Sequence, residues 1–253
     1  MALAVSTSVV NRLLDALPDK VCQSIHMQSE LVDLACGDLL SAPGERIQDV
    51  YFPTNSFISL EASVNHGVSL EVALIGNDGM LGLPLMLGTE TASVVARVQG
   101  AGGAWRIRAE DFKRIVRHTP VLRRELDRYT HVLMAQLAQT AACTCFHLLE
   151  PRLARRLLMA HDCANADYFY LTHARLAGIL GVRRSGVTTA AGELQRRGLI
   201  HYSRGGITIL DREGLERAAC SCYAMMHAAD RSSPDSQASL LQALGWPTKK
   251  MKA

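Results

Sequence analysis

Residues 171–210 read LTHARLAGILGVRRSGVTTAAGELQRRGLIHYSRGGITIL, and the order of residue types in this stretch predicts a helix-turn-helix. Thr172 is a good N-cap for a first short helix. Gly181 permits the left-handed residue that a sharp corner between two helices requires. A second helix is expected over residues 183–197, and Gly198 stands where a glycine commonly ends a helix. The apolar residues of both helices recur at helical spacing and would face inward: Leu176, Ile179, Leu180, Val187 and Leu194.

The outward face of the second helix carries side chains suited to DNA recognition. Near its N-terminus this face presents two arginines, a serine and two threonines: Arg183, Arg184, Ser185, Thr188 and Thr189. The first turns of such a helix enter the major groove, where arginine pairs with guanine and hydroxyl groups reach base edges. We therefore predict that these five residues contact DNA.

A short β-wing is expected directly after the second helix. Residues 199–202 and 207–209 are strand-like and flank the turn SRGG at residues 203–206. Arg204 lies at the tip of this turn, where its side chain would meet a phosphate. Two short helices joined at a glycine also occur in proteins that never contact DNA. The arginine content and the wing are therefore what favour a DNA-binding domain.

The charged residues are distributed unevenly along the chain. Residues 172–204 contain six arginines and a single acid, Glu193, whereas residues 47–96 contain no lysine or arginine. The net charge of +3 is too small to indicate a nucleic-acid partner by itself. Because a solvated face normally mixes both signs of charge, the arginine-rich segment indicates an anionic partner for the C-terminal part of the chain.

The N-terminal half has the pattern of a β-rich domain. Apolar and polar residues alternate over residues 32–108, with turn signals rich in glycine and asparagine between the alternating runs. The clearest unit is a predicted hairpin around the loop NHG at residues 65–67. Its first strand would place Ile58, Leu60, Ala62 and Val64 on one face, and its second Val68, Leu70, Val72 and Leu74. The region contains enough short strands to close a barrel or jelly roll.

A long helix is expected to begin at Pro120. Apolar residues follow it at intervals of four, three, four and four, and small residues widen the apolar stripe. One neighbouring surface needs less width than this, so a second copy of the helix could cover the rest. The alternative is a helix that packs only on its own β-domain. We predict a dimer interface centred on Leu126, Tyr129, Leu133 and Leu137.

Pro151 interrupts the helical pattern and indicates a boundary at Glu150-Pro151. The predicted organisation is a β-rich sensor-type domain with short flanking helices over residues 1–118, then a long dimerisation helix and hinge over 119–150. A winged helix-turn-helix domain over 151–230 and a tail over 231–253 complete it. The fold class is therefore α+β.

The chain resembles the Crp/Fnr family of bacterial transcription regulators. The resemblance rests on the helix-turn-helix segment, on EPRLARRLL before it, and on GDLLSAPGERIQDVYFP and GNDGMLGLPLMLG in the N-terminal half. It implies a double-stranded β-helix of the jelly-roll, cyclic-nucleotide-binding-like type, and a homodimer with two recognition helices in successive major grooves. By position, Arg184 matches the family's base-reading arginine and Thr172 its phosphate-contacting threonine, while we assign Arg183 to phosphate. Ser185 and Thr189 replace the usual glutamate and second arginine, so a different target sequence is expected.

The predicted effector site lacks a cation for a phosphate. Members of the resembled family that bind cyclic AMP use an Arg-Ser pair where this chain reads TASV at residues 91–94. A buried phosphate without a cationic partner carries a large desolvation cost. We therefore expect no response to cyclic AMP in the usual mode, and an apolar or uncharged ligand or none. The residues proposed for this pocket are Glu71, Gly79, Met80, Leu81, Gly82 and Ser93.

Cysteine usage and the absence of catalytic motifs limit the function classes further. Seven cysteines without a secretory leader favour a reducing, cytoplasmic location. Residues two apart on a helix do not face one another, so the Cys-x-Cys pairs predict no metal site, and no cofactor is expected. A redox switch at Cys143, Cys145 or Cys163 remains an alternative. No nucleophile elbow, P-loop or paired-carboxylate motif is present, which argues against an enzyme.

The predicted function is sequence-specific DNA binding by a homodimeric transcription regulator on a roughly palindromic operator. Its expected partners are double-stranded DNA, a second copy of the chain and an unknown small-molecule effector, with RNA polymerase as a further candidate and no membrane. The alternative is a signalling module that binds a small molecule or protein and whose helix-turn-helix does not read DNA. Basic residues on the second helix distinguish the two, and here they are retained.

Overall fold

The computed structural model describes residues 10–64, 68–164 and 166–230. Two antiparallel sheets form the N-terminal domain. The first has the strand order β1-β7-β3, from Glu30–Leu34, Gly102–Arg108 and Asp49–Pro53. The second has the order β2-β6-β4-β5, from Leu39–Ser41, Val95–Gly100, Phe57–Val64 and Val68–Ile75. Apolar residues from both sheets meet in the interior, among them Leu34 and Ala104 of the first sheet and Ile58 and Val98 of the second. Phe52 and Ile107 lie on the other face of the first sheet and pack against the short helices and α4 (Pro120–Phe146).

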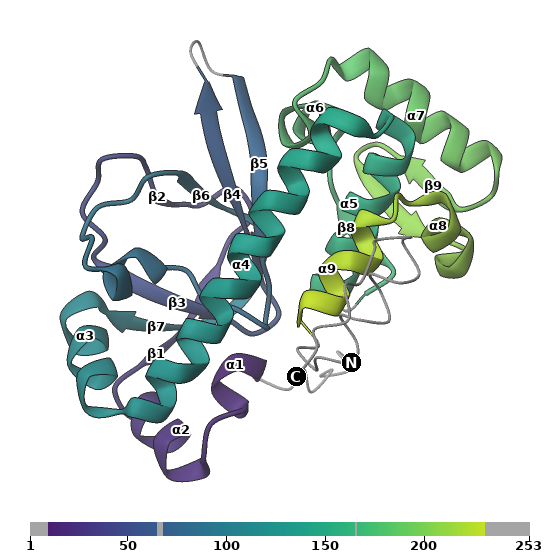
Figure 1. The fold of residues 1–253 in the computed structure, drawn as a ribbon. Coiled ribbons are helices and arrows are strands. Elements are labelled where there is room, and N and C mark those ends of the chain that lie inside the picture. The colour runs from purple at the N-terminus through teal and green to yellow at the C-terminus, as the bar shows by residue number, and fades with distance from the viewer. Residues whose placement is uncertain (1–9, 65–67, 165, 231–253) are drawn as a thin grey trace, which may run out of the picture.

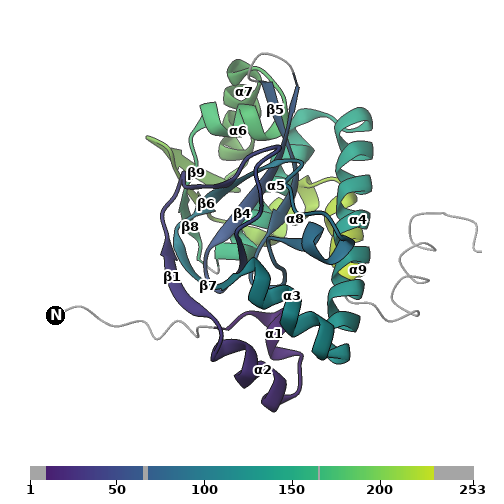
Figure 2. The ribbon, with the colours of Figure 1, turned by 90° about the vertical axis from the view of Figure 1, so that its left-hand side faces the viewer.

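Short helices close one end of this β-domain. They are α1 (Arg12–Asp15), α2 (Asp19–His26), the 3-10 helix η2 (Leu83–Leu87) and α3 (Ala109–His118). Asn11 ties α1 to the sheet, because its amide donates to the carbonyls of Pro53 and Gly79 at 2.8 and 3.0 Å. The recognition elements α6 and α7 lie at the opposite end of the molecule from α1 and α2 (Figures 1 and 2).

The predicted hairpin forms β4 and β5, and its loop lies outside the described residues. Its register shifts between Leu60 and Glu61, so the single uninterrupted alternation expected from the sequence is interrupted. Leu60 faces the β-domain core, whereas Glu61 and Glu71 oppose each other and are also buried. The C-terminal domain covers this second face of the hairpin.

Helix α4 (Pro120–Phe146) runs along the β-domain and connects it to the C-terminal domain (Figure 1). It ends at His147, whose backbone is extended, and α5 (Leu149–Ala164) begins two residues later. The break therefore precedes the position expected from Pro151. Pro151 instead lies in the first turn of α5, where the missing N–H has no intrahelical partner to lose.

The C-terminal domain is a helix-turn-helix with a three-stranded wing. It contains α6 (His173–Leu180), α7 (Arg184–Arg196) and α8 (Arg212–Ala218), and a sheet of order β8-β10-β9 from Tyr168–Tyr170, Gly206–Ile209 and Ile200–Ser203. Helix α9 (Cys222–Asp230) follows and packs against α4. The predicted α+β class is confirmed. None of the helices within the described residues is long and apolar enough to cross a membrane.

Candidate nucleic-acid interface

The turn between α6 and α7 forms through the local interactions that the sequence indicates. The hydroxyl of Thr172 accepts a hydrogen bond from the backbone N–H of Arg175 at 3.2 Å, which caps α6. Gly181 has a φ of 64°, a left-handed conformation that favours glycine. Leu176, Val187 and Leu194 are buried together beneath the two helices. This packing fixes the angle at which α7 presents its outer face.

The outer face of α7 is polar and accessible. Arg183, Arg184, Ser185, Thr188 and Thr189 are all exposed, and they occupy the N-terminal half of the helix. The hydroxyls of Thr188 and Thr189 donate to the carbonyls of Arg184 and Ser185, each at 3.1 Å. The structure thus brings together on one surface the five residues that the sequence proposes for DNA contact, four on α7 and Arg183 at its N-cap.

His173 supports this surface from α6. Its Nδ1 lies 3.0 Å from the Thr188 hydroxyl, and its ring stacks on Tyr202 of the wing at 3.9 Å between centroids. Because the Thr188 hydroxyl already donates to a carbonyl, His173 must be the donor in their contact. Burial, and then the charge of Arg184, lower the pKa of His173. The imidazole is therefore neutral at pH 7 and joins α6, α7 and the wing.

Three of the six arginines in this segment have carboxylate partners. Arg175 pairs with Glu61 of the β-domain and Arg196 with Glu193 of its own helix. Arg197 lies 2.6 Å from a carboxylate oxygen of Glu150. The three arginines without an ion pair in the part of the chain that the structure describes are Arg183, Arg184 and Arg204. These are the three that the sequence assigns to DNA.

The wing presents Arg204 on a tight two-residue turn. Arg204 and Gly205 both have positive φ, 48° and 90°, as a primed hairpin turn requires. A side chain at Gly205 would meet the ring of Tyr170 at 2.7 Å, so that position has no room for one. Arg204 is exposed, and it is the one non-glycine residue with positive φ in the described ranges. Such a conformation costs of order 1 kcal/mol or more, and such strain is typical of binding sites.

The predicted dimer residues are largely occupied within the protomer. Leu126 is fully buried, the Tyr129 hydroxyl donates to the Met80 carbonyl at 3.2 Å, and Leu133 packs on the β-domain. Burial raises the pKa of Tyr129. Of the four, Leu137 alone is exposed, at 37 %. The helical repeat correctly indicates a buried stripe, but the β-domain of the same chain covers most of it.

A different apolar face of α4 is exposed. It comprises Met134, 64 % exposed, together with Leu137, Ala138 and Ala141, and Phe146, 84 % exposed, ends the helix. Monomeric proteins rarely leave a contiguous apolar strip of this kind uncovered. The predicted interface residues stay a prediction, and the exposed apolar face available to a second copy is displaced around the helix from them, with Leu137 common to both.

A cavity of about 270 Å³ lies between the β-domain and α4. Met80, Leu81, Gly82 and Ser93 line it, as the sequence proposes for an effector pocket. Glu71 does not, because neighbouring residues of a strand face opposite sides and it is Val72 that lines the cavity. Gly79 is also outside it and lies against the ring of Tyr129. The lining residues include Asp49 and no lysine or arginine.

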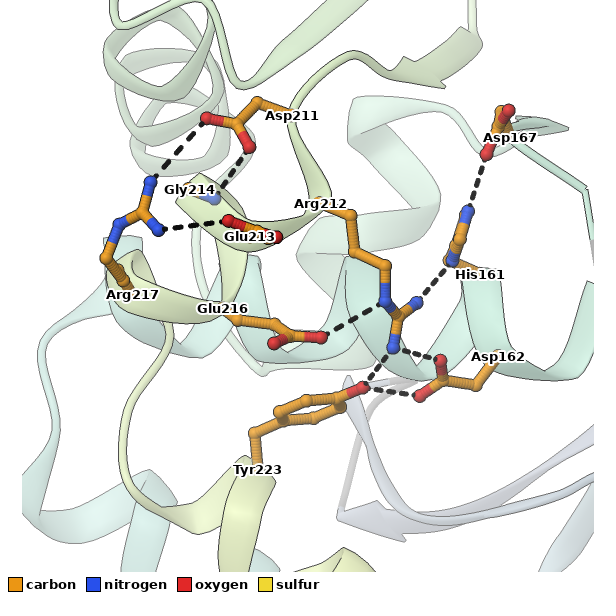
Figure 3. Close-up of polar contacts among 10 residues, drawn as sticks. All are labelled: His161, Asp162, Asp167, Asp211, Arg212, Glu213, Gly214, Glu216, Arg217 and Tyr223. Carbon is orange, nitrogen blue, oxygen red and sulfur yellow. Dashed lines mark hydrogen bonds and ion pairs between the residues drawn. The ribbon is translucent and has the colours of Figure 1, made fainter.

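A polar network joins α5, α8 and α9 (Figure 3). It lies beside a larger cavity of about 610 Å³. The Arg212 guanidinium lies 2.8 Å from Asp162 and donates to the Tyr223 hydroxyl at 2.8 Å and to His161 Nδ1 at 2.5 Å. Burial and the hydrogen bond to Asp162 raise the pKa of Tyr223. This network holds the start of α9 on the DNA-binding domain.

Three cysteines and a histidine, residue types that can bind a metal, meet near the hinge, and sequence reasoning missed this cluster. The donor atoms of Cys143, His147, Cys220 and Cys222 all lie within 4.8 Å of one another. Cys220 precedes α9 rather than lying on it, so the argument that residues two apart on a helix face apart does not hold for Cys220 and Cys222. The i, i+4 spacing of Cys143 and His147 was the available signal.

The comparisons with known proteins cover both parts of the chain. Residues 151–218 match the Crp-like helix-turn-helix domain. The transcriptional regulator SdrP of Thermus thermophilus is 28% identical over 199 residues, which are 75% of this chain and 94% of that protein.

Solved structures show the same fold over most of the chain. A regulator of the Crp/Fnr family from Eubacterium rectale matches with a TM-score of 0.64 and 19% identity, over 81% of this chain and 96% of that one. FixK2 of Bradyrhizobium japonicum matches with a TM-score of 0.64 and 13% identity, over 76% and 98%. The Crp/Fnr-family regulator TTHA1359 of Thermus thermophilus matches with a TM-score of 0.60 and 25% identity, over 75% and 98%. The similarity therefore extends well beyond the helix-turn-helix.

Proposed function

We propose that this chain is a DNA-binding transcription regulator of the Crp/Fnr type rather than an enzyme, and that it reads a roughly palindromic operator as a homodimer. The observation that carries the proposal is the division among the arginines of residues 172–204. Arg175 and Arg197 are paired with acids of other elements and Arg196 with Glu193 of its own helix. Arg183, Arg184 and Arg204 are exposed without an ion pair in the described residues. An exposed cluster of unneutralised guanidinium groups on a recognition helix and its wing favours DNA.

The exposed residues divide into two roles. Arg184, in the first turn of α7, is placed to pair with a guanine in the major groove, and Ser185, Thr188 and Thr189 lie beside it. Arg183, Arg204 and Thr172 flank this centre and would contact phosphates, which position the domain without reading sequence.

A homodimer would use the exposed apolar face of α4. Met134, Leu137, Ala138 and Ala141 occupy that face, and small residues allow two helices to approach closely. Joining two reading heads raises their affinity for a two-part site far above that of one head. We propose that the protein acts in the cytoplasm, with double-stranded DNA as its partner and RNA polymerase as a further one.

Cyclic AMP is not the effector in this proposal. A cyclic phosphate entering the cavity between the β-domain and α4 would meet Asp49 and no cationic lining residue. The lining is mostly aliphatic, with Leu60, Val72, Ile75 and Leu83 among its residues. An apolar or uncharged ligand fits this chemistry best.

Selection of binding sites from random duplexes, followed by fluorescence anisotropy at several salt concentrations, tests the proposal. Arg184→Ala should weaken operator binding by about 1–3 kcal/mol and leave random DNA nearly unaffected. Arg204→Asn removes the charge and places a residue that tolerates positive φ at the tip of the wing. It should weaken binding to the operator and to random DNA alike, and lower the slope of log affinity against log salt concentration by about one unit.

Arg196→Ala is the matched control, because Arg196 lies on the same helix and is paired with Glu193. This substitution should change neither the affinity for the operator nor the affinity for random DNA measurably. No salt-dependent binding by the wild type would refute the proposal and favour a signalling module whose helix-turn-helix does not read DNA.

A further inference from the structure

Three thiols and one imidazole converge where α9 begins and α4 ends. Cys143 and His147 are one helical turn apart at the end of α4, while Cys220 and Cys222 flank the start of α9. The Sγ atoms of Cys143 and Cys220 are 3.5 Å apart, and the Cys222 Sγ lies 3.3 Å from His147 Nδ1. The three cysteines are buried together as a cluster of their own and His147 is partly buried.

The spacing of these four donors fits one small metal ion. Zinc binds sulfur at about 2.3 Å and nitrogen at about 2.0–2.1 Å in a tetrahedron, so its ligand atoms lie roughly 3.5–3.8 Å apart. The donors here are all within 4.8 Å of one another. The ligands of an iron–sulfur cluster are divided among two or more iron atoms, and ligands on different irons must lie further apart than this. Three cysteines and a histidine also match a known donor set of closed, structural zinc sites.

Two buried arginines beside the cluster lack an anionic partner. Arg152 and Arg155 have no ion pair in the described parts of the chain; Arg152 donates to the Leu180 carbonyl at 2.6 Å and Arg155 contacts the Met226 sulfur at 3.3 Å. The Nε of Arg155 is buried without a hydrogen-bond acceptor. Three thiolates, a neutral imidazole and a divalent cation carry a net charge of −1, which would offset one of these two guanidinium charges.

Gln139 supplies a further contact around the cluster. Its Nε2 donates to the Cys222 sulfur at 2.9 Å from one turn before Cys143 on α4. A sulfur that accepts an amide hydrogen bond is better suited to the thiolate state than to the thiol. Hydrogen bonds of this kind orient metal ligands and tune their affinity.

We propose that Cys143, His147, Cys220 and Cys222 bind one zinc ion, which ties the start of α9 to the hinge end of α4. Binding deprotonates the three thiols and releases their protons to solvent. Four-coordinate binding leaves no open position, so the ion is structural rather than catalytic. The hinge between α4 and α5 begins at His147, so an occupied site would restrict how the DNA-binding domain moves relative to the long helix. The proposal does not depend on any DNA target.

Metal analysis of the full-length protein, purified under reducing conditions without chelator, tests this directly. Elemental analysis should find about one zinc per chain. Protein stripped of metal and titrated with Co²⁺ should develop the intense visible absorption of a tetrahedral, thiolate-bound cobalt centre. Cys222→Ser should abolish stoichiometric zinc and change that spectrum. Cys145→Ser is the control, because Cys145 is exposed on α4, two residues from Cys143, and outside the cluster, and it should behave as wild type.

A second variant protects the test against simple misfolding. Gln139→Ala removes an outer hydrogen bond without removing a ligand, and should weaken metal affinity by about tenfold or more at unchanged far-ultraviolet circular dichroism. The proposal is overturned if wild-type protein holds no stoichiometric metal, or if Cys222→Ser and Cys145→Ser give the same cobalt spectrum. It is equally overturned if mass spectrometry finds a Cys143–Cys220 disulfide in metal-free protein under these conditions.

Discussion

Replacing Glu71 with glutamine should destabilise the docking of the two domains. Glu71, on β5, and Arg156, on α5, are 7 % and 1 % exposed. The Arg156 Nε lies 2.5 Å from Glu71 Oε1, and its Nη2 donates to Oε2 at 3.0 Å. The Arg156 Nη1 has no hydrogen-bond acceptor. The guanidinium therefore depends on this one carboxylate for its charge balance.

The expected loss is about 3–5 kcal/mol, because removing one partner of a buried pair leaves an uncompensated buried charge. This is a large part of the total stability of a protein, which is typically about 5–15 kcal/mol. The double variant Glu71→Leu with Arg156→Met removes both charges and keeps similar volume. It should lie close to the wild type in stability, or above it.

Urea denaturation followed by circular dichroism, applied to the wild type, Glu71→Leu, Arg156→Met and the double variant, measures the coupling energy, and Glu71→Gln is measured beside them. Glu193→Gln is the control, since its ion pair with Arg196 is largely exposed and should contribute less than about 1 kcal/mol. A Glu71→Gln variant as stable as the wild type would refute the reasoning, as would an equal loss when Arg156 has already been replaced.

Three further outcomes follow from the same contacts. Ala138→Glu, on the exposed face of α4, should give monomers in sedimentation velocity. Leu126→Ala should keep the dimer and lose about 2–5 kcal/mol of stability, because it leaves a cavity in the core. A monomeric wild type would contradict this. Cyclic AMP at millimolar concentration should give no saturable heat in calorimetric titration, because the cavity lining includes no lysine or arginine. The lowered pKa of His173 means that the unfolded chain takes up its proton first as pH falls below 6.5. Thermal stability should therefore fall more in wild type than in His173→Gln between neutral pH and about pH 5, and equal losses would exclude this role.

The features predicted correctly from the sequence are those that depend on near neighbours in the chain. The Thr172 cap, the left-handed Gly181 and the apolar spacing along α6 and α7 each involve residues within a few positions of one another. Alternating residues likewise indicated the strands of the β-domain. These patterns reflect backbone geometry, which repeats every two residues in a strand and every 3.6 in a helix.

The remaining features required the tertiary structure, because they join residues far apart in the chain. The apolar repeat of α4 shows that one face is covered, but not whether the β-domain or a second copy covers it. The sequence does not distinguish the six arginines of residues 172–204 from one another. The fold does, because it places Glu61 against Arg175 and Glu150 against Arg197. The proposed zinc ligands come from two segments more than seventy positions apart, which only the packing of α9 on α4 brings together. Periodicity records that a side chain is buried, whereas the identity of its partner depends on the folded chain as a whole.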